Sequence, residues 1–561
     1  MTQLDILTII IFSVVVFVTG ISFSRTGKDI KSFFAGGGAV PWGISGLSLF
    51  MSFFSAGTFV AWGSIAYSEG FTAVVIQWMM GIAGLFIGFY LAGQWRKKNV
   101  ITAAEFITKR LGGHIQNFYT YIFLIISMFT SGAFLYPVAK IVEVSTGIPI
   151  YLCIIVLGGL IAVYTAIGGL WAVMVTDVLQ FIVLTSAVII VVPLVTDKVD
   201  GLQNFLSSAP DHFFNLTAGE YSWWFMLAFA IYNFVFIGGN WAYVQRYTSV
   251  SSPSKAKKVG WLFSVLYFIS PLIWMIPPMM YRVINPGLTG LETEDAYLLV
   301  CKEVLPGGVL GLILGGMIFA TSSSVNTTLN ISAGVFTNDI YKRLYPRSSD
   351  KGDVIVGRIS TLIFGALTVG VALIVPLMGG IVEVVFSVAA ITGGAMYLPV
   401  IWALFSKRQN GFTILCTTLL SLLVNIYFKF ISPEIFDFSL NRSEEMLLGM
   451  LFPAAMLVLI EFYLARKKVT DPLYEKFESS VKMTNGNPEE TKVSNVRGIR
   501  IIGISIGCIG VLVTALGLLA DFAQFIVVTT GAFVFLLGII IWIKATKVDK
   551  KQELELKSAD S

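Results

Sequence analysis

Histidine, cysteine and charge are the scarce features of this 561-residue sequence. It has two histidines, four cysteines and 13% charged residues. The cysteines lie far apart, with neither the spacing of a metal site nor the pattern of a disulfide framework. The histidines stand outside any catalytic-looking cluster, and no P-loop of the form GxxxxGK followed by Ser or Thr is present. These absences argue against an enzyme and against an ATP-driven pump.

Hydrophobic residues are abundant instead, at 56% of the chain. A single soluble core does not grow this large at this composition. Apolar runs of about 20 residues, the length of a membrane-crossing helix, recur throughout. The net charge of +5 then reflects loop topology rather than nucleic-acid binding. The sequence therefore predicts an all-α polytopic membrane protein with about fifteen spans. We place them at 3–23, 43–66, 70–95, 115–145, 149–168, 171–196, 222–247, 258–284, 307–340, 354–379, 381–406, 410–431, 443–465, 499–520 and 523–545.

The distribution of Lys and Arg predicts the orientation. Clusters of basic residues follow the odd-numbered spans, whereas the loops after even-numbered spans are poor in them. Cytoplasmic loops carry the excess of positive charge, so we expect the N-terminus outside the cell membrane and the C-terminus in the cytoplasm. The polar segment 466–498 is then cytoplasmic, and its composition predicts a disordered or loosely structured loop.

One predicted span, Gly315 to Tyr341, carries a run of hydroxyl side chains in its middle. Ala320, Ser323, Ser324 and Thr327 fall at i, i+3, i+4 and i+7, so they share one helical face. Uncharged oxygens of this kind suit a small hard cation. The alternative is that the hydroxyls bond back to their own helix or pack against a neighbour.

Two other spans look interrupted. The second span has Ser55, Gly57 and Gly63 in its middle, and the seventh has Gly238–Asn240. The two spans are five apart, so they cross in opposite directions, as in inverted repeats of spans 2–6 and 7–11. Paired broken helices point to a binding site at the midplane of a transporter. The alternative is that these glycines only allow close helix packing.

Asp177 lies inside the sixth predicted span. An ionisable residue within a span is expensive and is a candidate functional residue by default. The alternative is a salt bridge or a polar patch near the end of the helix.

Four segments resemble motifs of the sodium/solute symporter family, and they occur in the order found there: TAAEFITKRLG, GGLWAVMVTDVLQF, NWAYVQRY and SSSVNTTLNISAGVFTNDIY. The resemblance covers about residues 1–465 and extends to bacterial sodium-coupled sugar and organic-solute symporters. It implies a LeuT-like fold, with a five-plus-five inverted repeat and extra flanking helices. The expected parts are an N-terminal span and loop (1–42), the first repeat (43–196), an external loop (197–221), the second repeat (222–406), two additional spans (407–465), the cytoplasmic loop (466–498), two C-terminal spans (499–545) and a tail (546–561).

The resemblance also implies a sodium site where the broken second span meets the hydroxyl-bearing ninth span. The ligands would be the carbonyls of Met51, Phe54 and Ala320 with the hydroxyls of Ser323 and Ser324. Met51 and Phe54 match by position only, since their side chains are not donors.

Some members of the family bind a second sodium ion near the aspartate of the fifth core helix. Asp177, Ser323, Ser324 and Thr327 would form that site here. Asn326 stands where those members carry a hydroxyl. The chain is therefore expected to bind one or two sodium ions.

Solute-binding residues are implied on several core helices. Gln77 and Asn240 match positions that sugar carriers use, and Tyr243 matches a tyrosine that caps the substrate from the cytoplasmic side. Thr58 and Tyr267 are polar residues at positions where a sugar carrier has Gln and Lys. We expect no Arg or Lys to await a carboxylate at this site, although a helix N-terminus or bound sodium could hold one.

The resulting hypothesis is sodium-driven import of a small polar solute, sugar-like in character, by alternating access. The first alternative is sodium-coupled uptake of a carboxylate, sialic acid or another organic anion. A proton-coupled carrier on the same fold and a transporter-like receptor or sensor are further alternatives, and a channel is the least favoured transport class. The expected partners are the solute, sodium ions and the lipid bilayer, and the expected state is a monomer or weak homodimer.

Overall fold

A computed structural model describes residues 1–24, 40–100, 102–165, 170–345, 350–485 and 496–559. The elements in these ranges are helices, and none of the ranges forms a β-strand. The predicted all-α class is confirmed. A helix satisfies its backbone N–H and C=O groups within one segment, which is what hydrocarbon surroundings require.

The first half of the described chain forms α1 (Gln3–Ser24), α3 (Trp42–Met51), the π-helical turn η2 (Thr58–Trp62), α4 (Gly63–Glu69), α5 (Thr72–Phe86), η3 (Ile87–Leu91), α6 (Ala92–Lys97), α7 (Ala103–Leu111), α8 (Gly113–Thr146), α9 (Ile150–Thr165), α10 (Leu170–Lys198) and α11 (Leu202–Ser208). The second half forms α12 (Trp223–Gly239), α13 (Trp241–Thr248), α14 (Pro253–Trp274), α15 (Ile276–Ile284), the 3₁₀ helix η4 (Gly290–Asp295), α16 (Ala296–Val304), α17 (Val309–Val335), η5 (Phe336–Tyr341), α18 (Lys342–Leu344), α19 (Asp350–Ile374), α20 (Ile381–Phe405), α21 (Gly411–Ile426), α22 (Ser432–Phe436), α23 (Arg442–Arg466), α24 (Pro472–Asn485), α25 (Val496–Leu519) and α26 (Gln524–Ala559).

The predicted spans each correspond to helix in the structure. Within the described residues, 11 helices are long and apolar enough to cross a membrane, or 12 when the bent pair α12–α13 is taken as one span. Three shorter apolar helices, Gln3–Val16, Trp42–Met51 and Ile150–Ala162, match the remaining predicted segments.

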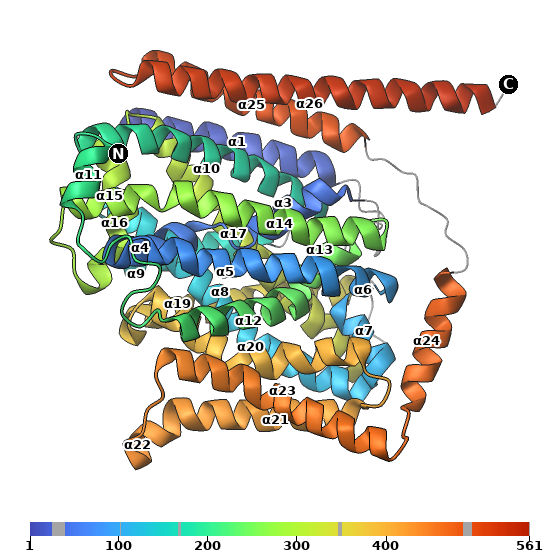
Figure 1. Ribbon diagram of the computed structural model, residues 1–561. Coiled ribbons are helices and arrows are strands. Elements are labelled where there is room, and N and C mark those ends of the chain that lie inside the picture. The colour runs from blue at the N-terminus through green and yellow to red at the C-terminus, as the bar shows by residue number, and fades with distance from the viewer. Residues whose placement is uncertain (25–39, 101, 166–169, 346–349, 486–495, 560–561) are drawn as a thin grey trace.

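The long helices run side by side, so the bundle has two ends (Figure 1). We call them the α11 end, with α11, α15, α16 and α22, and the α7 end, with α6, α7 and α24. Helix α1 begins at the α11 end, and α26 ends at the α7 end.

Helix α17 lies in the middle of the bundle. Its most apolar stretch is 71% buried, against 22% for α23 at the periphery. The helices α1, α8, α9, α10 and α19 pack around it. The carboxylate of Asp5 on α1 accepts hydrogen bonds from the backbone of Gly308 (2.7 Å) and Gly311 (3.1 Å). These N–H groups lie at the start of α17, where a helix offers them no carbonyl acceptor of its own. Asp5 supplies that acceptor and so fixes the start of the central helix.

Helix α24 corrects one expectation. Segment 466–498 is predicted to be loosely structured, but residues 472–485 form a helix that packs against α7. Its side chains Tyr474, Phe477 and Val481 lie three and four residues apart, and Phe477 and Val481 are buried. This narrow apolar stripe gives the helix a docking face despite the high charge of the segment.

Candidate functional site

The second span is broken between α3 and η2. Residues 52–55 leave the helical path, and the hydroxyl of Thr58 holds the turn by donating to the carbonyl of Phe53 (2.8 Å). In the described part of the chain, the backbone hydrogen bonds of this turn end on the carbonyls of residues 48, 49, 50 and 55, and the carbonyl of residue 53 accepts from the Thr58 hydroxyl. The carbonyls of Met51 and Phe54 stay outside that network, so their oxygens are available to a cation.

The break meets the central helix at Thr321. The backbone N–H of Ala56 donates to the hydroxyl of Thr321 at 2.8 Å, and that hydroxyl donates to the carbonyl of Met317 at 3.0 Å. Ala56 and Thr321 are fully buried. Ala320, one residue before Thr321, is also buried in α17. No role was predicted for Thr321 from the sequence, although it lies in the run of hydroxyl side chains in the ninth predicted span.

The seventh span is broken at Asn240. Helices α12 and α13 meet there at an angle of 63°. The Asn240 side chain accepts from the backbone N–H of Ala242 (3.0 Å), which caps α13, and donates to the hydroxyl of Tyr397 (3.1 Å). The bend leaves carbonyls of α12 without helical partners. The indole of Trp95 donates to that of Gly238 (2.8 Å), and the hydroxyl of Tyr247 donates to that of Ile237 (3.2 Å).

A cavity lies between the two breaks. Five of the predicted site residues line it: Met51, Asp177, Asn240, Tyr243 and Ser324. The structure thus brings together residues from four separate parts of the sequence. Asp177 is buried, and one of its carboxylate oxygens accepts from the hydroxyl of Ser48 at 2.7 Å. The ring of Tyr243 lies against that of Phe53, with centroids 4.6 Å apart, so the two breaks are in contact.

Other predicted residues lie outside the lining of this cavity. The ring of Tyr267 packs against Phe50, with centroids 5.0 Å apart, and the ring of Phe54 stacks on Trp274. The amide nitrogen of Gln77 donates within its own helix to Ala73 (3.4 Å), and its amide oxygen has no hydrogen-bond partner in the described chain. Thr58 and Ala320 are also absent from the lining. The side chains of Ser323 and Thr327 lie outside the described residues.

Arg246 on α13 is a basic residue at the central cavity, where the sequence led us to expect none. It is 2% exposed and lines the cavity with Asp177. One guanidinium nitrogen donates to the carbonyl of Ala242 at 3.0 Å, while the Nε of Arg246 has no hydrogen-bond partner in the described chain. By its position in the sequence, Arg246 belongs to the basic cluster at the end of the seventh predicted span, yet in the structure it lines the cavity.

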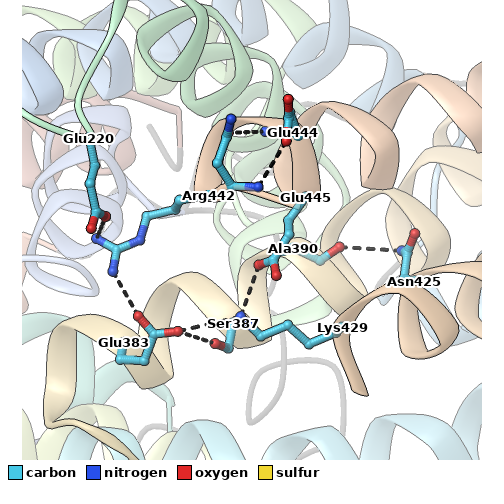
Figure 2. Close-up of polar contacts among 10 residues, drawn as sticks. Glu220, Glu383, Ser387, Ala390, Asn425, Lys429, Arg442, Glu444 and Glu445 are labelled. Carbon is cyan, nitrogen blue, oxygen red and sulfur yellow. Dashed lines mark hydrogen bonds and ion pairs between the residues drawn. The ribbon is translucent and has the colours of Figure 1, made fainter. Parts of the chain in front are cut away.

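A second cavity, of about 440 Å³, lies at the α11 end. Arg442 on α23 lies at its edge and pairs with Glu383 on α20 (2.7 Å) and with Glu220 before α12 (3.2 Å). Lys429 pairs with Glu383 (3.4 Å) and with Glu445 (2.9 Å), so the ion pairs form one network (Figure 2). The network joins α20 to α23 and to the segment before α12.

Aromatic rings separate the two cavities. Phe386 lies beneath the guanidinium of Arg442 (5.0 Å) and contacts Phe229 (5.8 Å) and Trp62 (6.0 Å). A stacked series continues along α12 to Phe236, which lines the central cavity. A series of packed rings therefore leads from Arg442 to the central cavity.

Known proteins match this chain over most of its length. A sequence model of the sodium:solute symporter family matches residues 33–419. The sodium/glucose cotransporter of Vibrio parahaemolyticus is 26% identical over 438 residues, which cover 72% of this chain and 80% of that protein. The sodium/sialic acid symporter SiaT of Proteus mirabilis is 26% identical over 412 residues, covering 70% and 83%.

Solved structures show the same fold. A Na⁺-coupled sialic acid symporter in a substrate-bound, outward-open state superposes with a TM-score of 0.69 at 21% identity, covering 82% of this chain and 98% of that chain. The nucleobase-cation-symport-1 transporter Mhp1, in a closed conformation, gives a TM-score of 0.50 at 14% identity. The predicted LeuT-like fold is confirmed. The family match, the fold and the two broken helices around one cavity agree: this chain is a multi-pass membrane transporter that belongs to the sodium:solute symporter family.

Proposed function

We propose that the chain imports a small hydroxylated solute, sugar-like in character, and that sodium ions moving down their gradient drive the import by alternating access. The observation that carries the proposal is the cavity between the breaks, where Asn240 and Tyr243 face Met51, Ser324 and Asp177. Amide and hydroxyl groups can bond the hydroxyls of such a solute, and oxygens at a helix break can hold sodium beside it.

The sodium ion would bind the carbonyls of Met51, Phe54 and Ala320 together with the hydroxyls of Ser323 and Ser324. The hydrogen bond between Ala56 and Thr321 supports this, because it holds the carbonyls of the break against α17. A second sodium ion would use Asp177, Ser323, Ser324 and Thr327. Each positive charge that falls through about 100 mV supplies roughly 2.3 kcal/mol, or somewhat less than two decades of solute accumulation.

The proposed orientation puts the α11 end outside the cell and the α7 end in the cytoplasm. The basic clusters after odd-numbered spans support it, since α6, α7 and the end of α26 carry them. In this orientation the aromatic rings and the ion-pair network around Arg442 lie on the outer side of the central cavity. We further propose that the inverted repeats are residues 43–196 and 222–406, and that the protein is a monomer or weak homodimer in the bilayer.

A second candidate is sodium-coupled uptake of an organic anion. Arg246 favours it, because a buried guanidinium whose Nε has no hydrogen-bond partner in the described chain lines the cavity and could donate to a carboxylate. The resemblance to a sialic acid symporter points the same way.

Thermal stability of the purified protein separates these candidates. D-glucose, myo-inositol and N-acetylneuraminate are each added in sodium and in potassium buffer. A ligand of the folded state raises the unfolding temperature by mass action. A shift that needs sodium together with glucose or inositol supports the first proposal, and a shift only with N-acetylneuraminate supports the second. A ligand that acts equally well in potassium contradicts sodium coupling at Ser323 and Ser324.

A further inference from the structure

Helix α24 stands outside the matched family region yet is firmly docked. The family match ends at residue 419, and α24 begins at Pro472. The ring of Phe477 contacts Phe106 of α7 edge to face, with centroids 5.7 Å apart. The ammonium group of Lys98, just after α6, pairs with Glu478 at 2.8 Å. The helix thus contacts both α7 and the end of α6 (Figure 1).

A buried ion pair fixes the start of α24. Arg110 on α7 is 1% exposed, and Asp471, directly before α24, is 5% exposed. The guanidinium of Arg110 donates to the carboxylate of Asp471 and to the carbonyls of Ser406 (2.8 Å) and Gln409 (2.9 Å) between α20 and α21. A pair this deeply buried tolerates little displacement, because either charge left alone would be buried without an opposite charge beside it. Helix α24 therefore has a defined place on α7.

The contact continues from α7 to the bend of the seventh span. Phe106 touches the ring of Trp95 on α6, with centroids 5.2 Å apart. Trp95 is fully buried, and its indole N–H donates to the carbonyl of Gly238 at 2.8 Å. Gly238 is two residues before Asn240, which lines the central cavity. Phe477, Phe106, Trp95 and Gly238 therefore form one continuous series of contacts from α24 to the candidate solute site.

We propose that Trp95 is a positioning residue for the bend at Asn240 and that α24 holds it in place through Phe106. Because α12 ends at Gly239, the carbonyl of Gly238 has no backbone N–H partner within the helix. The indole N–H of Trp95 takes the place of that donor. Fixing this carbonyl fixes the direction in which α12 ends and hence the position of Asn240. The consequence for transport rests on the proposed solute site, whereas the mechanical link from α24 to the bend does not.

Hydrogen–deuterium exchange of the full-length purified protein tests the link without any solute. The backbone N–H of Asn240 donates to Phe236 before the bend, and those of Tyr243 and Val244 donate to Asn240 after it, so peptides covering 236–244 report on the bend. Trp95→Phe removes the indole donor and keeps a ring, and Phe477→Ala removes the α24 contact. We expect each to accelerate exchange of 236–244 by about two- to tenfold, the effect of one typical hydrogen bond.

Two matched controls accompany these variants. Trp78→Phe removes an indole that also donates to a carbonyl, that of Phe268 (3.0 Å), away from the bend. Leu473→Ala shortens an exposed side chain on α24 itself. Neither control should change exchange at 236–244. If Trp95→Phe fails to fold, Phe106→Leu, which keeps an apolar side chain but removes the ring contact, takes its place.

The outcomes decide the two parts of the proposal. Unchanged exchange at 236–244 in both test variants overturns it entirely, and a change in Trp95→Phe alone overturns the role of α24.

For D-glucose uptake into liposomes, Trp95→Phe should raise KM by about two- to tenfold with the maximal rate within about twofold of wild type. A fall in the maximal rate with unchanged KM contradicts a positioning role. If wild type shows no sodium-dependent uptake of glucose, myo-inositol or N-acetylneuraminate, the proposed function fails, while the exchange result still decides the link.

Discussion

Replacing Thr321 by Val tests whether the broken second span must dock on α17 for sodium to bind. Valine keeps the approximate shape of the side chain but removes the hydroxyl that accepts from the N–H of Ala56 at 2.8 Å. Both residues are fully buried, so the N–H of Ala56 would be left without water or partner. An orphaned buried donor costs about 1–3 kcal/mol.

We expect this cost to appear mainly as a loss of sodium affinity. The proposed site uses carbonyls of the same break, so the sodium-bound state needs the break held against α17, whereas the sodium-free state can relax. If the whole cost falls on the sodium-bound state, the sodium concentration that gives half of the maximal rise in unfolding temperature increases roughly 5- to 150-fold. Sodium titration of the unfolding temperature measures it.

Thr361→Val is the matched control. Thr361 is also buried in a helix, and its hydroxyl donates to the carbonyl of Gly357 in that helix at 2.9 Å. Among the described residues no N–H group donates to this hydroxyl, so the sodium titration of Thr361→Val should match wild type. A folded Thr321→Val protein with an unchanged sodium midpoint would refute the view that docking of the break sets sodium affinity.

Three further predictions address the ion sites and a buried carboxyl. The double variant Ser323→Ala, Ser324→Ala should bind sodium much more weakly, and an unchanged sodium dependence of the folded protein would count against that site. Asp177→Asn should change the ratio of sodium to solute transported more than it changes solute affinity, which paired isotope fluxes measure; a wild-type ratio would contradict its role. Burial raises the pKa of Glu294, in η4 outside the spans, above its ordinary value of 4.5. A carboxyl with a raised pKa in the folded state contributes stability that is full below the unfolded pKa and is lost as pH rises through the folded pKa. Glu294→Gln should therefore flatten the fall in unfolding temperature as pH rises from about 4.5, and an unaltered pH profile would contradict this assignment.

The sequence could predict the spans and the two breaks for a physical reason. Hydrocarbon imposes helices of fixed length, so hydropathy reports each span directly. Glycines and an asparagine mid-span mark where such a helix cannot continue, and Asn240 indeed caps the helix after the bend. The predicted sodium and solute residues Met51, Ser324 and Asn240 lie far apart in the chain but line one cavity. Their roles there stay predictions.

Other features depend on tertiary contacts that no local pattern reports. The solute contacts predicted for Thr58 and Tyr267 stay predictions; in the structure the Thr58 hydroxyl closes a local turn and the Tyr267 ring packs on Phe50. Arg246 belongs by sequence to a basic cluster at the end of a span, where a solvent-exposed residue is expected. Hydropathy does not show which way the side chain of a residue after a bend points. Helix α24 was not predicted, because the polar and charged composition of segment 466–498 is typical of a disordered loop. The helical spacing of its apolar residues could have revealed it.

Uptake by purified protein in liposomes tests the central claim most directly. The liposomes contain potassium, and radiolabelled D-glucose, myo-inositol or N-acetylneuraminate is added outside with sodium or with potassium. The account predicts that one of these solutes accumulates above its external concentration only under an inward sodium gradient, and that dissipating the gradient abolishes accumulation. Accumulation that follows a pH gradient and is indifferent to sodium would contradict it.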